Sequence, residues 1–273
     1  MKFSSAVLAT MLAGVAQAAG YQCLIEASQV VELRASVDGT ISAVHVQRGD
    51  VLRKGQVLVE LQSAAERAAV DSARYRSEMA GQEATARTRL DFANKKLARV
   101  IDLENKGFLS TLSRDEAEAE RQLAQNELQA AVESRELAKI EYRRAREQLA
   151  LRTLVSPFNG VVVDRMLNPG DLAESGSGRK PVLKIARIDP LKVDVVVPAA
   201  MFGKVAPGQP ARVVATVGGA RFSAKVAMVD RVIDAASGTF VVRLELPNPQ
   251  LKVPVGSMCT AEFGAAAVAA ARP

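Results

Sequence analysis

Two short segments of the chain alternate β-branched and polar residues at a period of two, and the two segments match each other. The first spans 39–50 and the second 160–171; each begins with glycine and ends in Gly-Asp. Alternation bounded by glycine-containing turns predicts short, half-buried strands. Two related β units this far apart predict one small domain assembled from two halves, at 34–62 and 152–188.

The segment between these halves, residues 63–151, changes to a helical period. Steps of 3.5 residues from Ala65, and again from Ala117, place mainly apolar residues on one stripe of each arm. No proline occurs before Pro157, and Gly107 lies near the middle of the segment. The pattern predicts an antiparallel coiled-coil hairpin that turns at Gly107, with arms of about 40 residues, or roughly 60 Å.

Two details of the hairpin follow from local sequence. The stretch from Ser113 to Glu116 matches a capping box and predicts Ser113 as the N-cap of the second helix. Gly81 predicts a weak point in the first arm, costing about 1 kcal/mol relative to alanine. Each arm is still expected to be one uninterrupted helix.

Beyond residue 189 the chain returns to short alternating strands separated by turns rich in glycine and proline. This spacing predicts a small closed β-barrel at 189–264, followed by a short tail at 265–273. The strand candidates are Leu191–Val197, Ala211–Val217, Ala220–Asp230, Thr239–Leu246 and Met258–Phe263. The expected fold is therefore an α+β multidomain chain: a split β-sandwich interrupted by the hairpin and followed by a barrel.

Residues 1–18 have the features of a secretory signal peptide. Lys2 precedes a short apolar run, and Ala16 and Ala18 give the small-residue cleavage pattern. We expect cleavage, with a strand segment at 19–33 beginning the mature protein; the alternative is an uncleaved anchor. An exported chain can keep a disulfide, and we expect Cys23 to pair with Cys259. The alternative is two buried thiols that only pack.

Composition argues against several classes of function. The 273 residues include one histidine, two cysteines and no tryptophan, and 4% are aromatic. A histidine-based zinc site, a cysteine cluster and a Ser-His-Asp triad therefore lack most of their parts, so we do not expect an enzyme. Few aromatic side chains are available to stack on bases, so nucleic acid is not expected as a partner despite the net charge of +6.

The arrangement resembles a known family. Each β half resembles half of a biotinyl/lipoyl carrier domain, and the split domain with its hairpin resembles the periplasmic adaptor proteins (membrane fusion proteins, HlyD-like) of tripartite efflux systems. The family's tip motif is Arg, three residues, Leu, six residues, Ser, which Arg99, Leu103 and Ser110 match around the predicted turn. Segments Ser237–Arg243 and Leu246–Pro249 are similar to the family's β-barrel domain.

The resemblance implies that Arg99, Leu103 and Ser110 dock on a TolC-type outer-membrane channel. It further implies an inner-membrane transporter as the second partner, RND type ahead of ABC type, and a homo-oligomer, either a hexamer or a trimer of dimers. It implies no cofactor. From the residues alone, packing of Leu103 in the seam and capping of a helix by Ser110 remain alternatives. The family's membrane-proximal domain is expected to be absent or vestigial, because only residues 264–273 follow Phe263.

Two other functions fit the sequence less well than a bridging adaptor. A biotinyl/lipoyl carrier protein needs a lysine at the tip that joins the two halves, and Val59–Ala64 contains none. A periplasmic metal-binding accessory protein would use His45, methionines or Cys23, which form no spaced cluster. We therefore expect an interaction protein of the periplasm.

Overall fold

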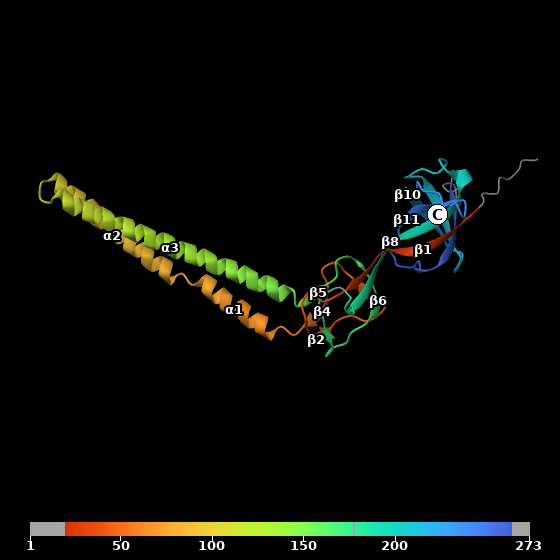
Figure 1. Ribbon diagram of the computed structural model, residues 1–273, viewed down its shortest axis with the longest axis horizontal. Coiled ribbons are helices and arrows are strands. Elements are labelled where there is room, and N and C mark those ends of the chain that lie inside the picture. Colours follow the sequence, from red (N-terminus) through yellow and green to blue (C-terminus); the bar gives the residue numbers. More distant parts are fainter. Residues whose placement is uncertain (1–19, 177, 264–273) are drawn as a thin grey trace, which may run out of the picture.

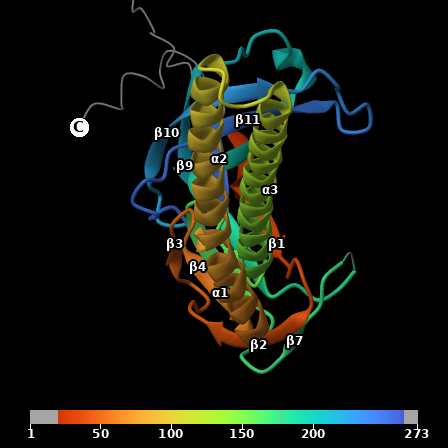
Figure 2. The ribbon, with the colours of Figure 1, turned by 90° about the vertical axis from the view of Figure 1, so that its left-hand side faces the viewer.

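The computed structural model describes residues 20–176 and 178–263; the expected signal peptide (1–18) and tail (265–273) lie outside them. The molecule is elongated, with a helical hairpin at one end, a β domain in the middle and a second β domain at the other end (Figure 1). Seen along its length, the two arms of the hairpin lie side by side (Figure 2). The predicted α+β class is confirmed.

The middle domain is a barrel-sandwich built from both halves of the repeat. One sheet has the order β5-β4-β2-β7, and β3, β6 and the first part of β8 lie opposite. These strands are β2 (Gly39–Val44), β3 (Val51–Leu52), β4 (Val57–Leu61), β5 (Thr153–Val155), β6 (Gly160–Arg165) and β7 (Leu172–Ala173). Ile41, Leu58 and Ile185 are fully buried in the core between the layers.

The two halves of this domain exchange equivalent hydrogen bonds. The amide of Ile41 donates to the carbonyl of Asp171, and the amide of Val162 donates to the carbonyl of Asp50, each at 2.9 Å. Both aspartates also use a carboxylate oxygen to close their own turn, accepting from the amide three residues earlier at 2.7 and 2.8 Å. The repeated Gly-Asp motif therefore locks each half against the other, which explains its presence in both copies.

Two long strands, β1 (Tyr21–Leu33) and β8 (Leu183–Pro198), run through both β domains and pair with each other. Ile25 on β1 is buried in the outer domain, whereas Leu33 at its other end packs on the core of the middle domain. A register shift between Ala27 and Gln29 marks the passage from one to the other. The domain boundary predicted at 188/189 lies inside β8, so the two domains share continuous strands.

The outer domain is a closed barrel with the order β1-β12-β9-β10-β11-β8, completed by the β1–β8 pairing. Its other strands are β9 (Pro210–Ala215), β10 (Arg221–Val229), β11 (Thr239–Leu246) and β12 (Met258–Phe263), with a short helix η1 (Ala199–Met201) after β8. Val193, Val213 and Leu244 are fully buried in its core. Cys23 and Cys259 are cross-strand partners of β1 and β12 and are joined as a disulfide.

The hairpin consists of α1 (Ala64–Glu78), α2 (Gly81–Asn105) and α3 (Thr111–Ala150). Alanines fill much of the seam, including Ala73 on α1, Ala93 on α2 and Ala124 on α3. Small seam residues let two helices approach closely, as the periodicity predicted. The expectation of one uninterrupted first helix was wrong, because that arm breaks at Met79 and Ala80. The weak point predicted at Gly81 is therefore the first residue of a separate helix.

Candidate functional site

The hairpin turns at the end of the molecule farthest from the barrel (Figure 1). Gly107 follows the end of α2 with φ of +82°, a left-handed conformation that glycine adopts without strain. The amide of Gly107 donates to the carbonyl of Glu104 at 2.8 Å, and the amide of Phe108 donates to the carbonyl of Leu103 at 3.0 Å. These bonds satisfy the last carbonyls of α2. The turn predicted at Gly107 is confirmed.

Ser110 is the N-cap of α3. It has extended backbone angles (φ −86°, ψ 159°), and its Oγ accepts a hydrogen bond from the amide of Ser113 at 3.4 Å. The predicted capping box beginning at Ser113 was wrong, because α3 already starts at Thr111 and Ser113 lies in its first turn. The hydroxyl of Ser110 therefore holds the start of a helix within its own chain.

Arg99 and Leu103 lie one helical turn apart on α2, on the same face. Arg99 is exposed, and its Nε donates to the carbonyl of Lys95 at 3.2 Å. Within the described residues its guanidinium makes no ion pair, so most of its donors face solvent. The side chain of Leu103 is 40% exposed and is thus available to a partner. The structure brings both residues to the outer end of the hairpin.

The structure exposes three apolar side chains at the tip that are not part of the Arg-Leu-Ser motif. Phe108 is 75% exposed, Leu112 is 64% exposed, and Leu109 between them is also exposed. A Phe-Leu pair directly after a turn glycine was the sequence signal that could have identified them, because apolar residues at an exposed turn are uncommon. Together with Leu103 they give the tip an apolar surface, the kind of patch that marks a protein contact.

Ion pairs cross between the two arms near the tip. Arg114 on α3 lies 3.9 Å from Glu104 on α2, and Lys96 pairs with Glu120 slightly farther down. The hydrogen bond from Arg114 to Glu118, with Glu118 and Glu104 charges nearby, raises the pKa of Arg114 above its usual value. Exposed pairs of this kind contribute little stability each. They link residues that the antiparallel alignment of α2 and α3 places side by side.

The tip can therefore present a guanidinium and an apolar surface to another protein. The residues considered for a metal site do not come together: His45 Nε2 lies 3.0 Å from Glu60, and Cys23 is in the disulfide. Among residues 20–176 and 178–263, no group of three or more His, Cys, Asp or Glu side chains is placed to hold a metal ion. No helix in those ranges has both the length and the hydrophobicity needed to cross a membrane.

Sequence comparison defines the class of protein. Residues 29–178 match the family model of the CzcB-like barrel-sandwich hybrid domain, and residues 191–267 match that of the CusB-like β-barrel domain. The chain therefore belongs to the family of membrane fusion proteins that carry these domains, as its resemblance predicted.

Individual relatives and solved structures agree with this family. The chain is 28% identical over 207 residues to the pyoverdine export membrane fusion protein PvdR of Pseudomonas aeruginosa, covering 75% of this chain and 53% of that one. It is 26% identical over 231 residues to the multidrug resistance protein MdtA of Cronobacter turicensis, covering 82% and 52%. The chain thus spans about half the length of these relatives.

The fold is also similar to that of solved proteins. The crystal structure of MacA from Actinobacillus actinomycetemcomitans matches with a TM-score of 0.72 at 20% identity, covering 90% of this chain and 77% of that one. A membrane fusion protein from Streptococcus pneumoniae R6 matches with a TM-score of 0.60 at 19% identity, covering 90% and 98%. At these identities the likeness supports the fold alone.

Proposed function

We propose that the protein is a periplasmic adaptor that bridges an inner-membrane transporter to a TolC-type outer-membrane channel in a tripartite efflux or secretion system. The observation that carries the proposal is the exposed tip, where Arg99 and Leu103 stand on one face beside an apolar turn. The family membership supports it, because relatives such as PvdR are named export membrane fusion proteins. The role is assembly and coupling, with no covalent chemistry.

Each tip residue would have a different role in docking. The guanidinium of Arg99 offers a planar set of donors to carboxylates or carbonyls of the channel. Leu103 and Phe108 would fill apolar pockets, and buried apolar anchors usually carry much of the energy of such contacts. Ser110, whose hydroxyl already caps α3, would keep these side chains in place.

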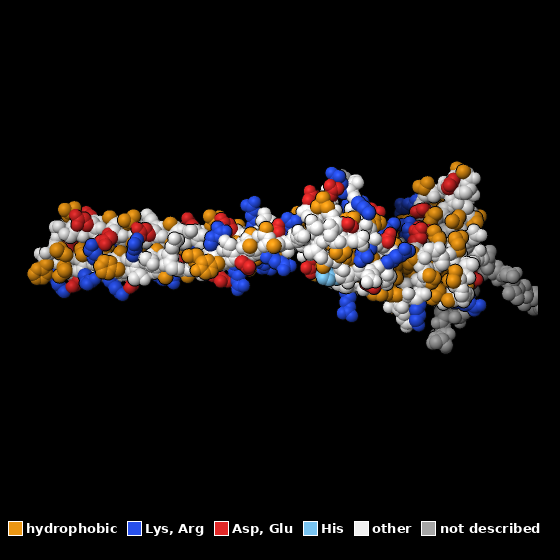
Figure 3. All heavy atoms as spheres, turned by 90° about the horizontal axis from the view of Figure 1, so that it is seen from below, with side chains coloured by type: hydrophobic (Ala, Val, Ile, Leu, Met, Phe, Trp, Pro, Cys, Tyr) orange, Lys and Arg blue, Asp and Glu red, His pale blue; other side chains and the backbone are white. Residues whose placement is uncertain are grey.

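The sides of the hairpin support a homo-oligomer, a hexamer or a trimer of dimers. Phe92 on α2 and Leu123 and Leu137 on α3 are 58%, 61% and 58% exposed. All three occupy the same heptad position relative to the seam, so they lie along one side of the antiparallel pair. Figure 3 shows hydrophobic side chains at intervals along the hairpin surface. Neighbouring hairpins that pack through this side would form a tube that no single hairpin can line.

The barrel is the proposed surface for the transporter, with an RND type favoured over an ABC type. A hollow of about 390 Å³ lies between the loop after η1 and the end of β10, with Phe202 and Met228 in its lining. Val232, in the loop that follows β10, is 79% exposed. The expected signal peptide supports location in the periplasm, where a barrel at one end and a docking tip at the other suit a bridge.

The proposal predicts that Arg99→Asp abolishes co-purification of the protein with its outer-membrane channel. The substitution places a negative charge where the partner would accept donors, so binding should fall at least tenfold, below detection in a pull-down. Because Arg99 is exposed and forms no ion pair among the described residues, the thermal melting temperature should stay within about a degree.

Arg143→Asp is the matched control, since it makes the same charge change on an exposed part of α3 far from the tip. It should leave channel binding intact. Equal recovery of the channel with the Arg99→Asp variant and with the unmodified protein would reject the tip as the docking site.

A further inference from the structure

The first arm of the hairpin is broken where the second arm is continuous. Met79 is extended (ψ 115°), and its amide makes only a 3.3 Å bond to the carbonyl of Arg76. Helical bonding resumes with the amide of Ala84 donating to the carbonyl of Ala80. In the described part of the chain, amides 80–83 form no backbone bond to α1, and the N-cap of α2, Ala80, provides no side-chain hydrogen bond. The break is thus made without the groups that usually stabilise one.

A change of heptad phase accompanies the break. Ala73 and Ser77 are the buried residues of α1, whereas Ala86 and Ala93 are those of α2. Heptad packing needs multiples of about 3.5 residues, and the interval from 77 to 86 does not fit. A straight arm in phase with Ala86 would bring residues 72 and 79 into the seam instead. The structure shows the first of these packings, and heptad counting defines the second.

The base of the hairpin is fixed to the middle β domain. Arg152, just after α3, donates to Glu66 in the first turn of α1 at 2.5 Å. It also donates to the carbonyl of Asp38 at 2.8 Å. Arg76, near the end of α1, lies 3.5 Å from Glu141 on α3. These contacts tie α1, α3 and the β domain together below the break, so bending at the base itself is restrained.

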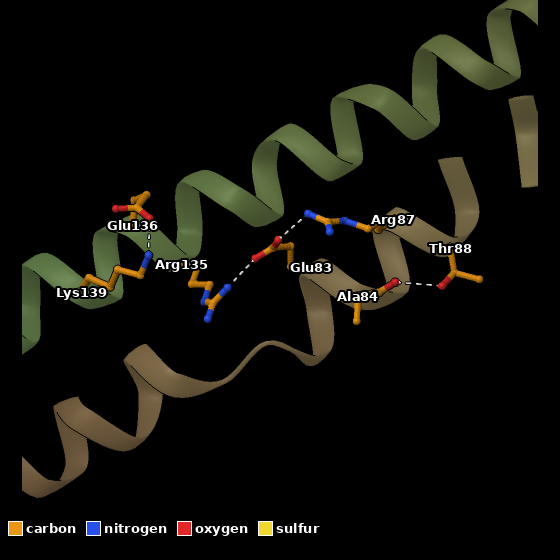
Figure 4. A network of polar contacts seen from close by, with 7 residues as sticks. All are labelled: Glu83, Ala84, Arg87, Thr88, Arg135, Glu136 and Lys139. Atoms are coloured by element: carbon orange, nitrogen blue, oxygen red, sulfur yellow. Dashed lines mark hydrogen bonds and ion pairs between the residues drawn. The ribbon is translucent and has the colours of Figure 1, made fainter. Parts of the chain in front are cut away.

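Above the break, contacts with α3 are made by the first turn of α2. Glu83 pairs with Arg135 on α3 at 2.9 Å and with Arg87 at 3.0 Å (Figure 4). The Nε of Arg135 is buried and has no hydrogen-bond partner among the described residues. An unpaired buried donor counts against the bent arrangement. The contacts at the joint are therefore only partly satisfied in this packing.

Space is available at the break for movement. A hollow of about 1,000 Å³ runs beside it, and its lining includes Met79, Gly81 and Leu137. The side chain of Met79 is 59% exposed, so the bent arm leaves uncovered the residue that a straight arm would bury. A Cβ added to Gly81 would meet no atom within 4 Å. Alanine at position 81 therefore fits the bent arm without a clash.

We propose that Met79 and Ala80 form a hinge between α1 and α2, at which the first arm can repack against the continuous α3. The arm exchanges between the bent packing, with Ala73 and Ser77 in the seam, and a straight packing, with Met79 buried and amides 80–83 bonded. Two discrete packings of one element are what a conformational switch requires. The exchange would change how the first arm packs while α3 remains one helix.

Spin-label distances across the break test the hinge. Labels carried by non-canonical amino acids at the exposed positions Asp71 and Asn94 leave the native cysteines unchanged. The full-length protein should show two distance populations, of which the straight one lies near 35 Å for the backbone. Met79→Pro should remove the straight population, because proline fits the φ of −65° at this position and forbids a continuous helix. Gly81→Ala should enrich it about fivefold.

Thr88→Ala is the control, because it raises helix propensity within α2 without touching the break; it should leave the distribution unchanged. Far-UV circular dichroism checks that each variant is folded. If the unmodified protein and the Gly81→Ala variant both show only the distance seen with Met79→Pro, the bend is permanent and the hinge is rejected. The measurement needs no partner, so its outcome is independent of the proposed function.

Discussion

At the scale of single residues, the three motif positions at the tip have different roles. Arg99 and Leu103 are exposed and free to meet a partner, whereas the hydroxyl of Ser110 is used to cap α3. The alternative that Ser110 caps its own helix therefore describes this structure. A serine at this point of the motif can act by holding the turn in shape, without touching the channel.

Substitutions at Ser110 can distinguish capping of α3 from direct contact with the channel. Ser110→Ala should destabilise the first turn of α3 by about 1 kcal/mol, because the amide of Ser113 loses the hydroxyl oxygen as an acceptor and keeps only the backbone carbonyl of Ser110. Hydrogen exchange at that amide should accelerate about fivefold. Ser110→Asp keeps an acceptor at the N-cap, so exchange should stay near its original rate and channel binding should be retained. Loss of binding in both variants, with exchange restored in the aspartate variant, would show that the hydroxyl itself is a contact.

Residue roles were predictable where local chemistry decides them. The left-handed turn at Gly107 followed from glycine's conformational freedom, whereas Arg99 was singled out by its match to the family's tip motif. The exposure of Phe108 did not, because a sequence pattern does not distinguish an apolar residue that packs from one that faces solvent. The start of α3 was misplaced by three residues because two serines compete for the same cap.

At the scale of elements, periodicity predicted nearly all of the strands and both arms of the hairpin. It placed Ser72 and Arg76 in the seam of the first arm, whereas the structure buries Ala73 and Ser77. The seam of α1 is thus shifted by one residue from the predicted seam, and the break at Met79 allows this shift relative to α2. Two phases compete within one arm, and packing against α3 decides between them. Periodicity along one arm carries no information about how that arm packs against α3.

Strand pairing places Cys23 of β1 opposite Cys259 of β12, and we propose that this disulfide forms in the exported protein. Mass spectrometry of unreduced peptides should show the two cysteines linked. Since the bond joins strands near the two ends of the described chain, replacing both cysteines by alanine should lower the free energy of unfolding by about 2–4 kcal/mol. Two free thiols in protein recovered from the periplasm would contradict the proposal.

At the scale of the whole molecule, the two surfaces proposed for assembly, the hairpin tip and the barrel, lie at opposite ends of the fold (Figure 1). β1 and β8 run through both β domains, and Arg152 ties the hairpin to the middle one. The repeat halves, the hairpin and the barrel were each predictable, but the sharing of strands was not. That sharing depends on pairing between β1 and β8, which lie far apart in the sequence, and no local pattern reveals it.

The central claim is that the hairpin tip binds the outer-membrane channel, and photo-crosslinking tests it most directly. A photoreactive phenylalanine analogue at position 108 should crosslink to the periplasmic helical end of the purified TolC-type channel. The same analogue at Tyr75, which is 70% exposed near the base of the hairpin, should give no crosslink. A complex that forms with crosslinks from position 75 and none from position 108 would contradict the account.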